Sequence, residues 1–207
     1  MAQHLITSVA DLRALMGDPV HELILVKSLA SLTSPMKQYI KLSPFLCLAT
    51  HGKDGTSDVS PRGDAPGFVH VMDAKTVVIP DRNGNKRLDS IVNIINQPSV
   101  ALLFMIPGVL ETLRVNGRGA ISTDPSLLER FDVNGKLPAL VIVVTVEEAF
   151  GHCSKAFRRS KLWEPDYQPD TKVPTLAELM SGHLQLDQDT TSMLEAAIEH
   201  DAQNNMY

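Results

Sequence analysis

The stretch that most constrains the fold is Thr76–Ser99, where an apolar run, a polar loop and an amphipathic pattern follow one another. The run Val77-Val78-Ile79 is typical of a buried strand, and the loop 81–85 contains only polar residues and glycine. Apolar residues then recur at the spacing of one helical face: Leu88, Ile91, Val92, Ile94 and Ile95. The sequence therefore predicts a strand, a loop and a helix that begins at about Lys86 and Arg87.

This predicted junction has the chemistry of an anion-binding site. The first turn of a helix leaves backbone N–H groups unpaired, and the helix dipole adds partial positive charge there. Lys86 and Arg87 place two cations at the same point, which favours a phosphate over a carboxylate because together they can neutralise more than one charge. The alternative is that Arg82, Lys86 and Arg87 form an ordinary solvated basic turn.

Composition narrows the class of ligand and the compartment. A net charge of -5 over 207 residues argues against a nucleic-acid surface, so a local basic cluster favours a small anionic ligand. No apolar run approaches the roughly 18 residues that span a bilayer, and the N-terminus lacks a signal-peptide pattern. Cys47 and Cys153 stand far apart, which predicts free thiols in a reducing compartment. We expect a cytoplasmic protein that binds neither nucleic acid nor membrane.

Metal binding is not expected. The segment Asp81–Asn85 matches the opening of a calcium loop, but Lys86 and Val92 stand where such a loop needs Gly and Glu. His152 and Cys153 are adjacent, with no third ligand nearby to complete a zinc site.

Short strand-like runs occupy the middle of the chain. They number five to seven and enclose one or two helices, which predicts a small barrel in a mainly β, mixed α+β fold. The runs cover residues 45–50, 56–60, 68–72, 76–80, 100–106, 109–122 and 139–146. Helical patterns flank them at 8–15, 21–32 and 36–42, and again at 149–160, 175–181 and 188–200. Ser8 is expected to cap the first of these helices, and Gly17 and Pro19 to end it. We therefore divide the chain into an N-terminal helical segment (1–43), a barrel domain (44–163) and a C-terminal helical tail (164–207).

Three motifs in this order resemble those of the pyridoxamine-phosphate-oxidase-like split β-barrels that bind flavin mononucleotide (FMN). They are SDVSPRGD at 57–64, DRNGNKRLDS at 81–90 followed by QPSVALLF at 97–104, and VLETLRVNGRG at 109–119. The ending HCSKAFRRSKLW at 152–163 is similar to that of a bacterial subgroup of uncharacterised flavin-binding proteins. The resemblance implies an FMN-binding split barrel that works as a homodimer, with the cofactor in a cleft between the two copies.

The resemblance also implies which residues contact the cofactor. The residues implied to contact the phosphate are Asn85, Lys86, Arg87 and Ser90, together with Asp81 and Arg82 in the preceding loop. Those implied to contact the flavin ring are Ser60, Pro61 and Arg62. Polar contacts to the cofactor are implied for Glu111, Thr112 and Arg114 of the later strand. A C-terminal group that would cover the flavin from the partner chain is implied at Arg158, Arg159, Lys161 and Trp163. Two alternatives stay open: Arg62 in a salt-bridged surface bulge, and Trp163 as an anchor for a C-terminal helix.

The function predicted from these features is that of an FMN-dependent oxidoreductase. Hydride would pass through flavin N5 to or from an unknown small organic substrate or a nicotinamide, while the protein supplies orientation and electrostatics, so we assign no catalytic residue. The short acidic C-terminal helices argue against vitamin B6 oxidation. One alternative is a non-catalytic flavin, deazaflavin or haem binding or storage protein of the same fold, with His70 or His152 as axial ligand for haem. The other is an interaction module that binds an acidic partner surface.

Overall fold

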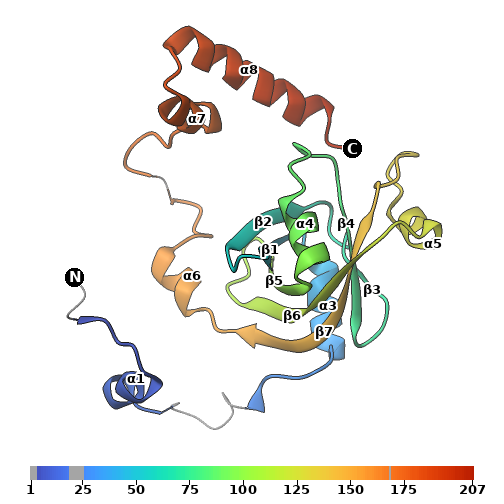
Figure 1. Ribbon diagram of the computed structural model, residues 1–207, viewed down its shortest axis with the longest axis vertical. Helices are drawn as coiled ribbons and strands as arrows, with labels where there is room; N and C mark the ends of the chain where they lie inside the picture. The colour runs from blue at the N-terminus through green and yellow to red at the C-terminus, as the bar shows by residue number, and fades with distance from the viewer. Residues whose placement is uncertain (1–3, 19–25, 168) are drawn as a thin grey trace.

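The computed structural model describes residues 4–18, 26–167 and 169–207. Its centre is one strongly curved antiparallel sheet with the strand order β2-β1-β5-β6-β7-β4-β3 (Figure 1). The strands are β1 (Phe45–His51), β2 (Ser57–Gly63), β3 (His70–Val71), β4 (Thr76–Pro80), β5 (Ser99–Met105), β6 (Thr112–Ser122) and β7 (Val141–His152). This is the mixed α+β split barrel that the sequence predicted.

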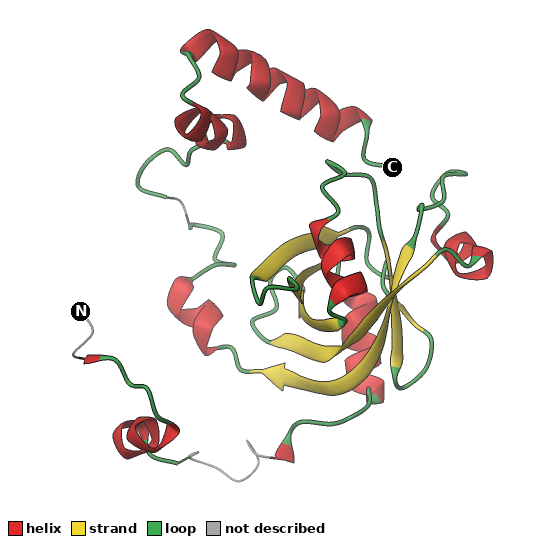
Figure 2. Cartoon of the chain, viewed as in Figure 1, coloured by secondary structure: helices red, strands yellow, loops and turns green. Residues whose placement is uncertain are grey.

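Helices lie around and beyond the sheet (Figure 2). They are α1 (Val9–Met16), α3 (Ser34–Leu42), α4 (Asp89–Asn96), α5 (Pro125–Leu128), α6 (Lys155–Ser160), α7 (Leu176–Leu184) and α8 (Gln188–Asn204), with a 3-10 turn at Glu129–Phe131. None of the helices in the described part of the chain combines the length and apolar character that a membrane crossing requires. Cys47 and Cys153 are free thiols, as predicted.

The barrel core comes from the inward-facing residues of alternating strands. In β1 and β5 every second side chain is buried, so that Leu46, Leu48, Leu102 and Phe104 have no exposed surface. Successive side chains of a strand point to opposite faces, which places these four on the same side of the sheet. Burial of each such side chain contributes roughly 1.5–3 kcal/mol.

Helix α4 closes the core next to the candidate site. Its Ile91 and Ile94 are buried, and β6 makes room for them at Gly119, where an added Cβ would lie 3.1 Å from Ile94. Leu88, Val92 and Ile95 are 48%, 50% and 68% exposed, so the apolar residues that the sequence assigned to one helical face are not buried together. The apolar residues of α4 occupy two faces, and only one of them meets the sheet.

Several predicted boundaries were wrong. Helix α4 begins at Asp89 and not at Lys86, because Lys86 and Leu88 adopt left-handed backbone conformations that a right-handed helix cannot include. Strand β2 continues through Pro61, which pairs with Cys47 at the sheet edge, where a missing N–H is tolerated. Strand β7 continues to His152 because β6 pairs with it over that whole length, so the helix expected from residue 149 starts only at Lys155.

The N-terminal predictions had mixed outcomes. Ser8 caps α1 through a 3.1 Å bond from the Asp11 N–H, and Gly17 ends it, as expected. Residues 21–25 of the helix expected at 21–32 lie outside the described residues. That helix does not reach residue 32, because Leu29 forms a β-bridge with Ala149.

Candidate functional site

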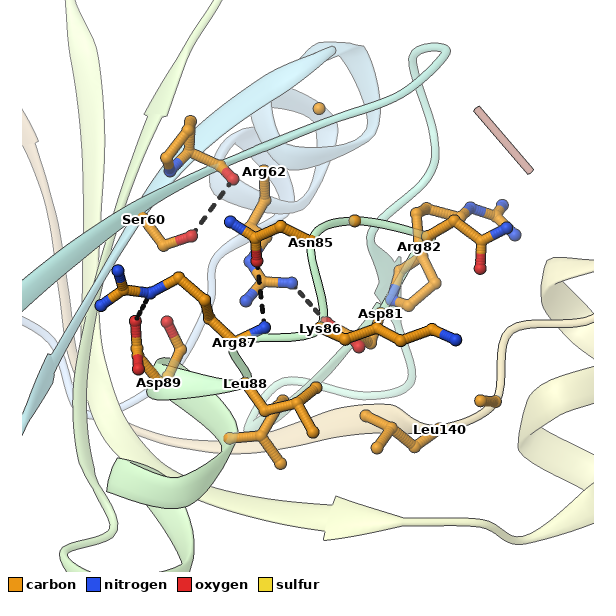
Figure 3. A pocket seen from close by; sticks show the side chains of 18 of the residues that line it. Ser60, Arg62, Asp81, Arg82, Asn85, Lys86, Arg87, Leu88, Asp89 and Leu140 are labelled. Atoms are coloured by element: carbon orange, nitrogen blue, oxygen red, sulfur yellow. Dashed lines mark hydrogen bonds and ion pairs between the residues drawn. The ribbon is translucent and has the colours of Figure 1, made fainter. Parts of the chain in front are cut away.

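A cavity of about 810 Å³ lies where β2, the end of β4 and the start of α4 meet (Figure 3). Nine of the sixteen predicted site residues line it: Ser60, Pro61, Arg62, Asp81, Arg82, Asn85, Lys86, Arg87 and Ser90. The sequence motifs at 57–64 and 81–90 thus form opposite walls of one cavity. Residues that the sequence prediction missed include Asp58, Asp89 and Leu140.

The junction between β4 and α4 leaves the N-terminus of α4 open. Lys86 and Leu88 have φ values of 56° and 60°, a strained conformation for residues with a side chain. Leu88 occupies the N-cap position and makes no capping hydrogen bond, so the first-turn N–H groups of α4 have no side-chain cap among the described residues. The Asn85 side-chain oxygen accepts from the Arg87 N–H at 3.0 Å and shapes the turn before them.

Two crossed ion pairs join the walls of the cavity. Arg62 of β2 pairs with Asp81, and Arg82 pairs with Asp64 at 2.8 Å between Nε and Oδ2. Arg82 also donates to the Phe131 carbonyl oxygen at 2.9 Å. All four charged side chains are less than one-fifth exposed. The salt bridge that the alternative for Arg62 proposed is therefore present. Asp81 and Asp64 already balance the charges of Arg62 and Arg82 within the protein.

Lys86 and Arg87 are the basic side chains most available to a ligand. Both are exposed and extend in opposite directions in Figure 3. Arg87 pairs with Asp89 at 2.8 Å, but these side chains are 73% and 50% exposed. An ion pair so exposed contributes little. Within the described residues Lys86 has no ion-pair partner, so each side chain is free to turn toward an anion at the start of α4.

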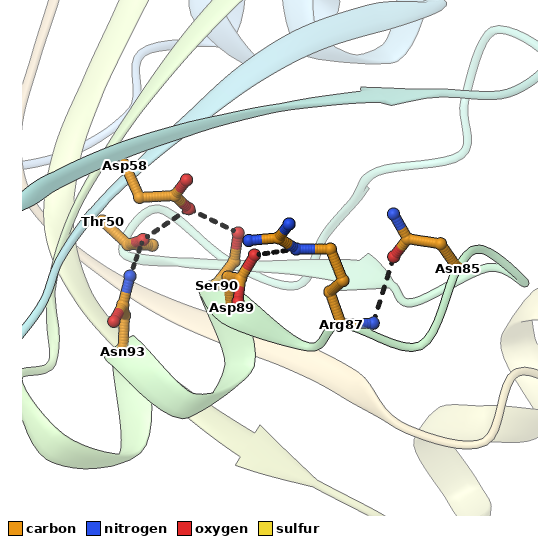
Figure 4. A network of polar contacts seen from close by, with 7 residues as sticks. All are labelled: Thr50, Asp58, Asn85, Arg87, Asp89, Ser90 and Asn93. Carbon is orange, nitrogen blue, oxygen red and sulfur yellow. Dashed lines mark hydrogen bonds and ion pairs between the residues drawn. The ribbon is translucent and has the colours of Figure 1, made fainter. Parts of the chain in front are cut away.

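Ser90 is buried and already bonded (Figure 4). Its hydroxyl and that of Thr50 both donate to Asp58 Oδ2, each at 3.2 Å, and Asn93 donates to the Thr50 oxygen at 3.0 Å. This network ties α4 to β1 and β2. Ser90 therefore fixes the position of the helix. Asp58 lies two residues before Ser60 on the same face of β2, and this strand period is the sequence signal that could have identified it.

The other seven predicted residues do not line this cavity. They are Glu111, Thr112, Arg114, Arg158, Arg159, Lys161 and Trp163. The Arg114 guanidinium lies 4.5 Å from the centre of the Phe150 ring, and its Nε is buried without a hydrogen-bond partner in the described structure. Trp163 donates to the Val109 carbonyl oxygen at 3.1 Å and stacks on Phe157, so it anchors the segment after α6 to the barrel. Within one chain, these seven residues therefore do not join the nine predicted residues that line the cavity.

Neither candidate haem ligand reaches the cavity. His70 stacks against Phe131 with ring centres 4.3 Å apart, and His152 lies 5.0 Å from the Phe150 ring. Burial lowers the pKa of both imidazoles, with further lowering by Arg130 for His70 and by Arg114 and Lys27 for His152. Among the residues lining the cavity there is no His, Cys, Met or Tyr that could ligate iron axially.

The family of the chain follows from its match to a family model described as pyridoxamine 5'-phosphate oxidase, which covers residues 32–153. The match spans more than half of the sequence, and the chain belongs to this family. The family resemblance suggested by the motifs is thus confirmed. No curated protein matches the chain.

Several solved structures are similar to part of this chain. HupZ from Group A Streptococcus is 22% identical, with a TM-score of 0.47, over 58% of this chain and 93% of its own. General Stress Protein 26 from Bacillus anthracis is 17% identical (TM-score 0.42; 56% and 92% covered). An FMN-binding protein from Syntrophomonas wolfei is 10% identical (TM-score 0.44; 56% and 83% covered).

Proposed function

We propose that the protein is an FMN-dependent oxidoreductase of the pyridoxamine 5'-phosphate oxidase family. The observation that carries the proposal is the open N-terminus of α4 in the wall of the 810 Å³ cavity, with Lys86 and Arg87 directly before it. Helix N-termini bind phosphate through free N–H groups and the helix dipole, and the two mobile cations supply the remaining charge.

The cavity suits FMN in size and in charge. Its volume lies within the range of roughly 300–1,000 Å³ that is usual for small-molecule sites. Four basic and three acidic side chains line it, so its net charge is only slightly positive. A dianionic phosphate would therefore depend on Lys86, Arg87 and the α4 N–H groups, because Arg62 and Arg82 are held by carboxylates.

Arg62 is the residue we place beside the flavin ring. Its Nε is buried without a hydrogen-bond partner within the described residues, although another of its nitrogens is paired with Asp81. A polar edge of the ring would give this donor an acceptor and would place a cation where negative charge develops on reduction. When bound, FMN supplies hydride transfer through N5. The side chains on β2 and at the β4–α4 junction orient the ring and hold its phosphate.

We also propose that the working unit is a homodimer in which the second group of residues completes the site of the partner copy. Within one chain, Arg114 and the basic side chains of α6 lie away from the cavity, so they would contribute to a cofactor site only across an interface. The cleft between copies would then receive the phosphate site from one chain and the closing residues from the other.

The alternative is a non-catalytic binding or storage protein of the same fold. The absence of an axial ligand in the cavity lining favours flavin or deazaflavin over haem. The visible spectrum of the purified protein, with mass spectrometry of the ligand released on denaturation, distinguishes these cofactors. A colourless protein that ignores added flavin would support the interaction module instead. Oxidation of reduced nicotinamide by the flavin-loaded protein would separate turnover from storage.

The placement of the phosphate is tested by changing Lys86→Ala and Arg87→Ala together. Loss of two charge-assisted contacts should weaken FMN binding by on the order of 100-fold. Riboflavin, which lacks the phosphate, should bind the variant and the wild type equally, and the thermal midpoint should barely move because both side chains are exposed.

The matched control removes two exposed lysines elsewhere, Lys53→Ala with Lys75→Ala, which lie outside the cavity lining. This control should bind FMN like the wild type. Unchanged FMN affinity in the Lys86 and Arg87 double variant would refute the placement.

A further inference from the structure

The C-terminal tail returns to the barrel at the candidate site. Helices α7 and α8 pack against each other, and the chain then turns so that its C-terminus lies beside the loop between β4 and α4 (Figure 1). Across the described residues 169–207, the hydrogen bonds to the barrel both involve Tyr207. Tyr207 is thus the point at which the tail is fastened.

Tyr207 binds one of the crossed ion pairs. Its hydroxyl donates to Asp64 Oδ1 at 2.7 Å, and its ring centre lies 5.3 Å from the Arg82 guanidinium carbon. Its backbone oxygen accepts from the Lys136 ammonium at 3.0 Å. Asp64 is only 5% exposed and uses its other oxygen for Arg82. The hydroxyl and the ring therefore complete the surroundings of the Asp64–Arg82 pair.

The Asp64–Arg82 pair in turn holds the loop between β4 and α4. Arg82 is the second residue of the loop 81–88, and its side chain spans from Asp64 to the Phe131 carbonyl oxygen. Farther along, the loop is exposed and includes the two strained residues Lys86 and Leu88. Contacts that immobilise Arg82 reduce the freedom of the segment that presents Lys86 and Arg87, and such preorganisation raises affinity.

We infer that Tyr207 is a positioning residue of the candidate site. It fixes the Asp64–Arg82 pair, and through that pair it fixes the loop that presents Lys86 and Arg87 to a phosphate. The part of this inference that concerns FMN rests on the proposed function, whereas the part that concerns the loop does not.

The loop is tested first, in the full-length protein without flavin. Hydrogen exchange is followed by NMR at the Asp81 and Arg87 amides, which donate to the Leu140 carbonyl and the Asn85 side chain. Tyr207→Ala should speed exchange at both amides by about tenfold, and Tyr207→Phe, which keeps the ring over Arg82, by about fivefold or less. Tyr167→Ala, an exposed tyrosine of the same tail, is the matched control and should change neither. Unchanged exchange in Tyr207→Ala would overturn the inference.

Binding is tested second, with FMN and riboflavin as probes. Tyr207→Phe should weaken FMN binding by about fivefold and Tyr207→Ala by about tenfold, while riboflavin affinity stays constant. A merely structural role would lower both affinities together, and that result would overturn the inference. If the wild type binds neither flavin, the proposed function fails, and the exchange experiment still decides the role of Tyr207. If the wild type binds FMN and both Tyr207 variants match it, the inference fails and the proposed function stands.

Discussion

The two groups of predicted site residues have different fates in the structure. Those on β2 and at the β4–α4 junction meet around one cavity, whereas those at 111–114 and in the segment 158–163 do not line it. The first group comes from two short motifs, at 57–64 and 81–90. The residues of each motif are neighbours in the sequence, so a single strand or loop places all of them at the cavity. The second group needs another surface before it can act with the first. A single chain therefore brings only the first group together around a cavity.

The largest expected effect comes from combining defects in the two regions. Arg158→Ala with Arg159→Ala should weaken FMN binding by about tenfold or more if these cations close the partner's site. Mixing this variant with the Lys86 and Arg87 double variant, after unfolding and refolding together, should restore wild-type affinity at about one quarter of the sites. Restoration follows because half of the dimers are mixed, and one of the two sites in each mixed dimer has no defect.

Equilibrium dialysis of FMN against the mixture measures this fraction. The control is each variant refolded alone, which should restore none. A mixture that binds no more FMN than its components would show that the second region does not act across an interface. The two regions would then differ in function as well as in position.

A smaller effect separates the ion pairs inside the first region. Arg62→Ala leaves Asp81 unpaired at 16% exposure and should lower the free energy of unfolding by about 2 kcal/mol. Arg87→Ala removes an exposed pair and should change it by less than about 1 kcal/mol. Urea unfolding followed by circular dichroism gives both values. Equal losses would mean that burial does not distinguish structural from ligand-facing cations here.

The smallest effect concerns pH. Burial acts to raise the pKa of Asp64, but hydrogen bonds from Tyr207, the Ala65 N–H and Arg82, together with the charge of Arg82, hold it below its ordinary value. A depressed pKa stabilises the fold above the unfolded-state value of about 3.9, and this contribution is lost as pH falls through the folded-state value. Asp64→Asn should therefore flatten the decline in stability of the wild type below about pH 4, measured by urea titrations. An unchanged slope would show that Asp64 gains nothing from its three donors.

Local patterns predicted much of the fold and nine of the residues that line the cavity. Alternating or continuous apolar runs identified the strands, Ser8 and Gly17 bounded α1, and the sequence pattern placed the basic cluster at 82–87 at a strand–loop–helix junction. The start of α4 was misplaced because left-handed residues such as Leu88 carry no strong sequence signal. The end of β7 was misplaced because its last residues are held by pairing with β6, a contact distant in sequence.

The sequence by itself determined the barrel class, the family resemblance and the basic cluster between a strand and a helix, because these depend on the periodicity and chemistry of neighbouring residues. Only the tertiary structure decided which cations are free. Arg62 and Arg82 are neutralised by Asp81 and Asp64 from the opposite motif, while Lys86 is left without a partner in the described residues. It also brought Tyr207 to Asp64. Such pairings join residues far apart along the chain, and no local pattern encodes them.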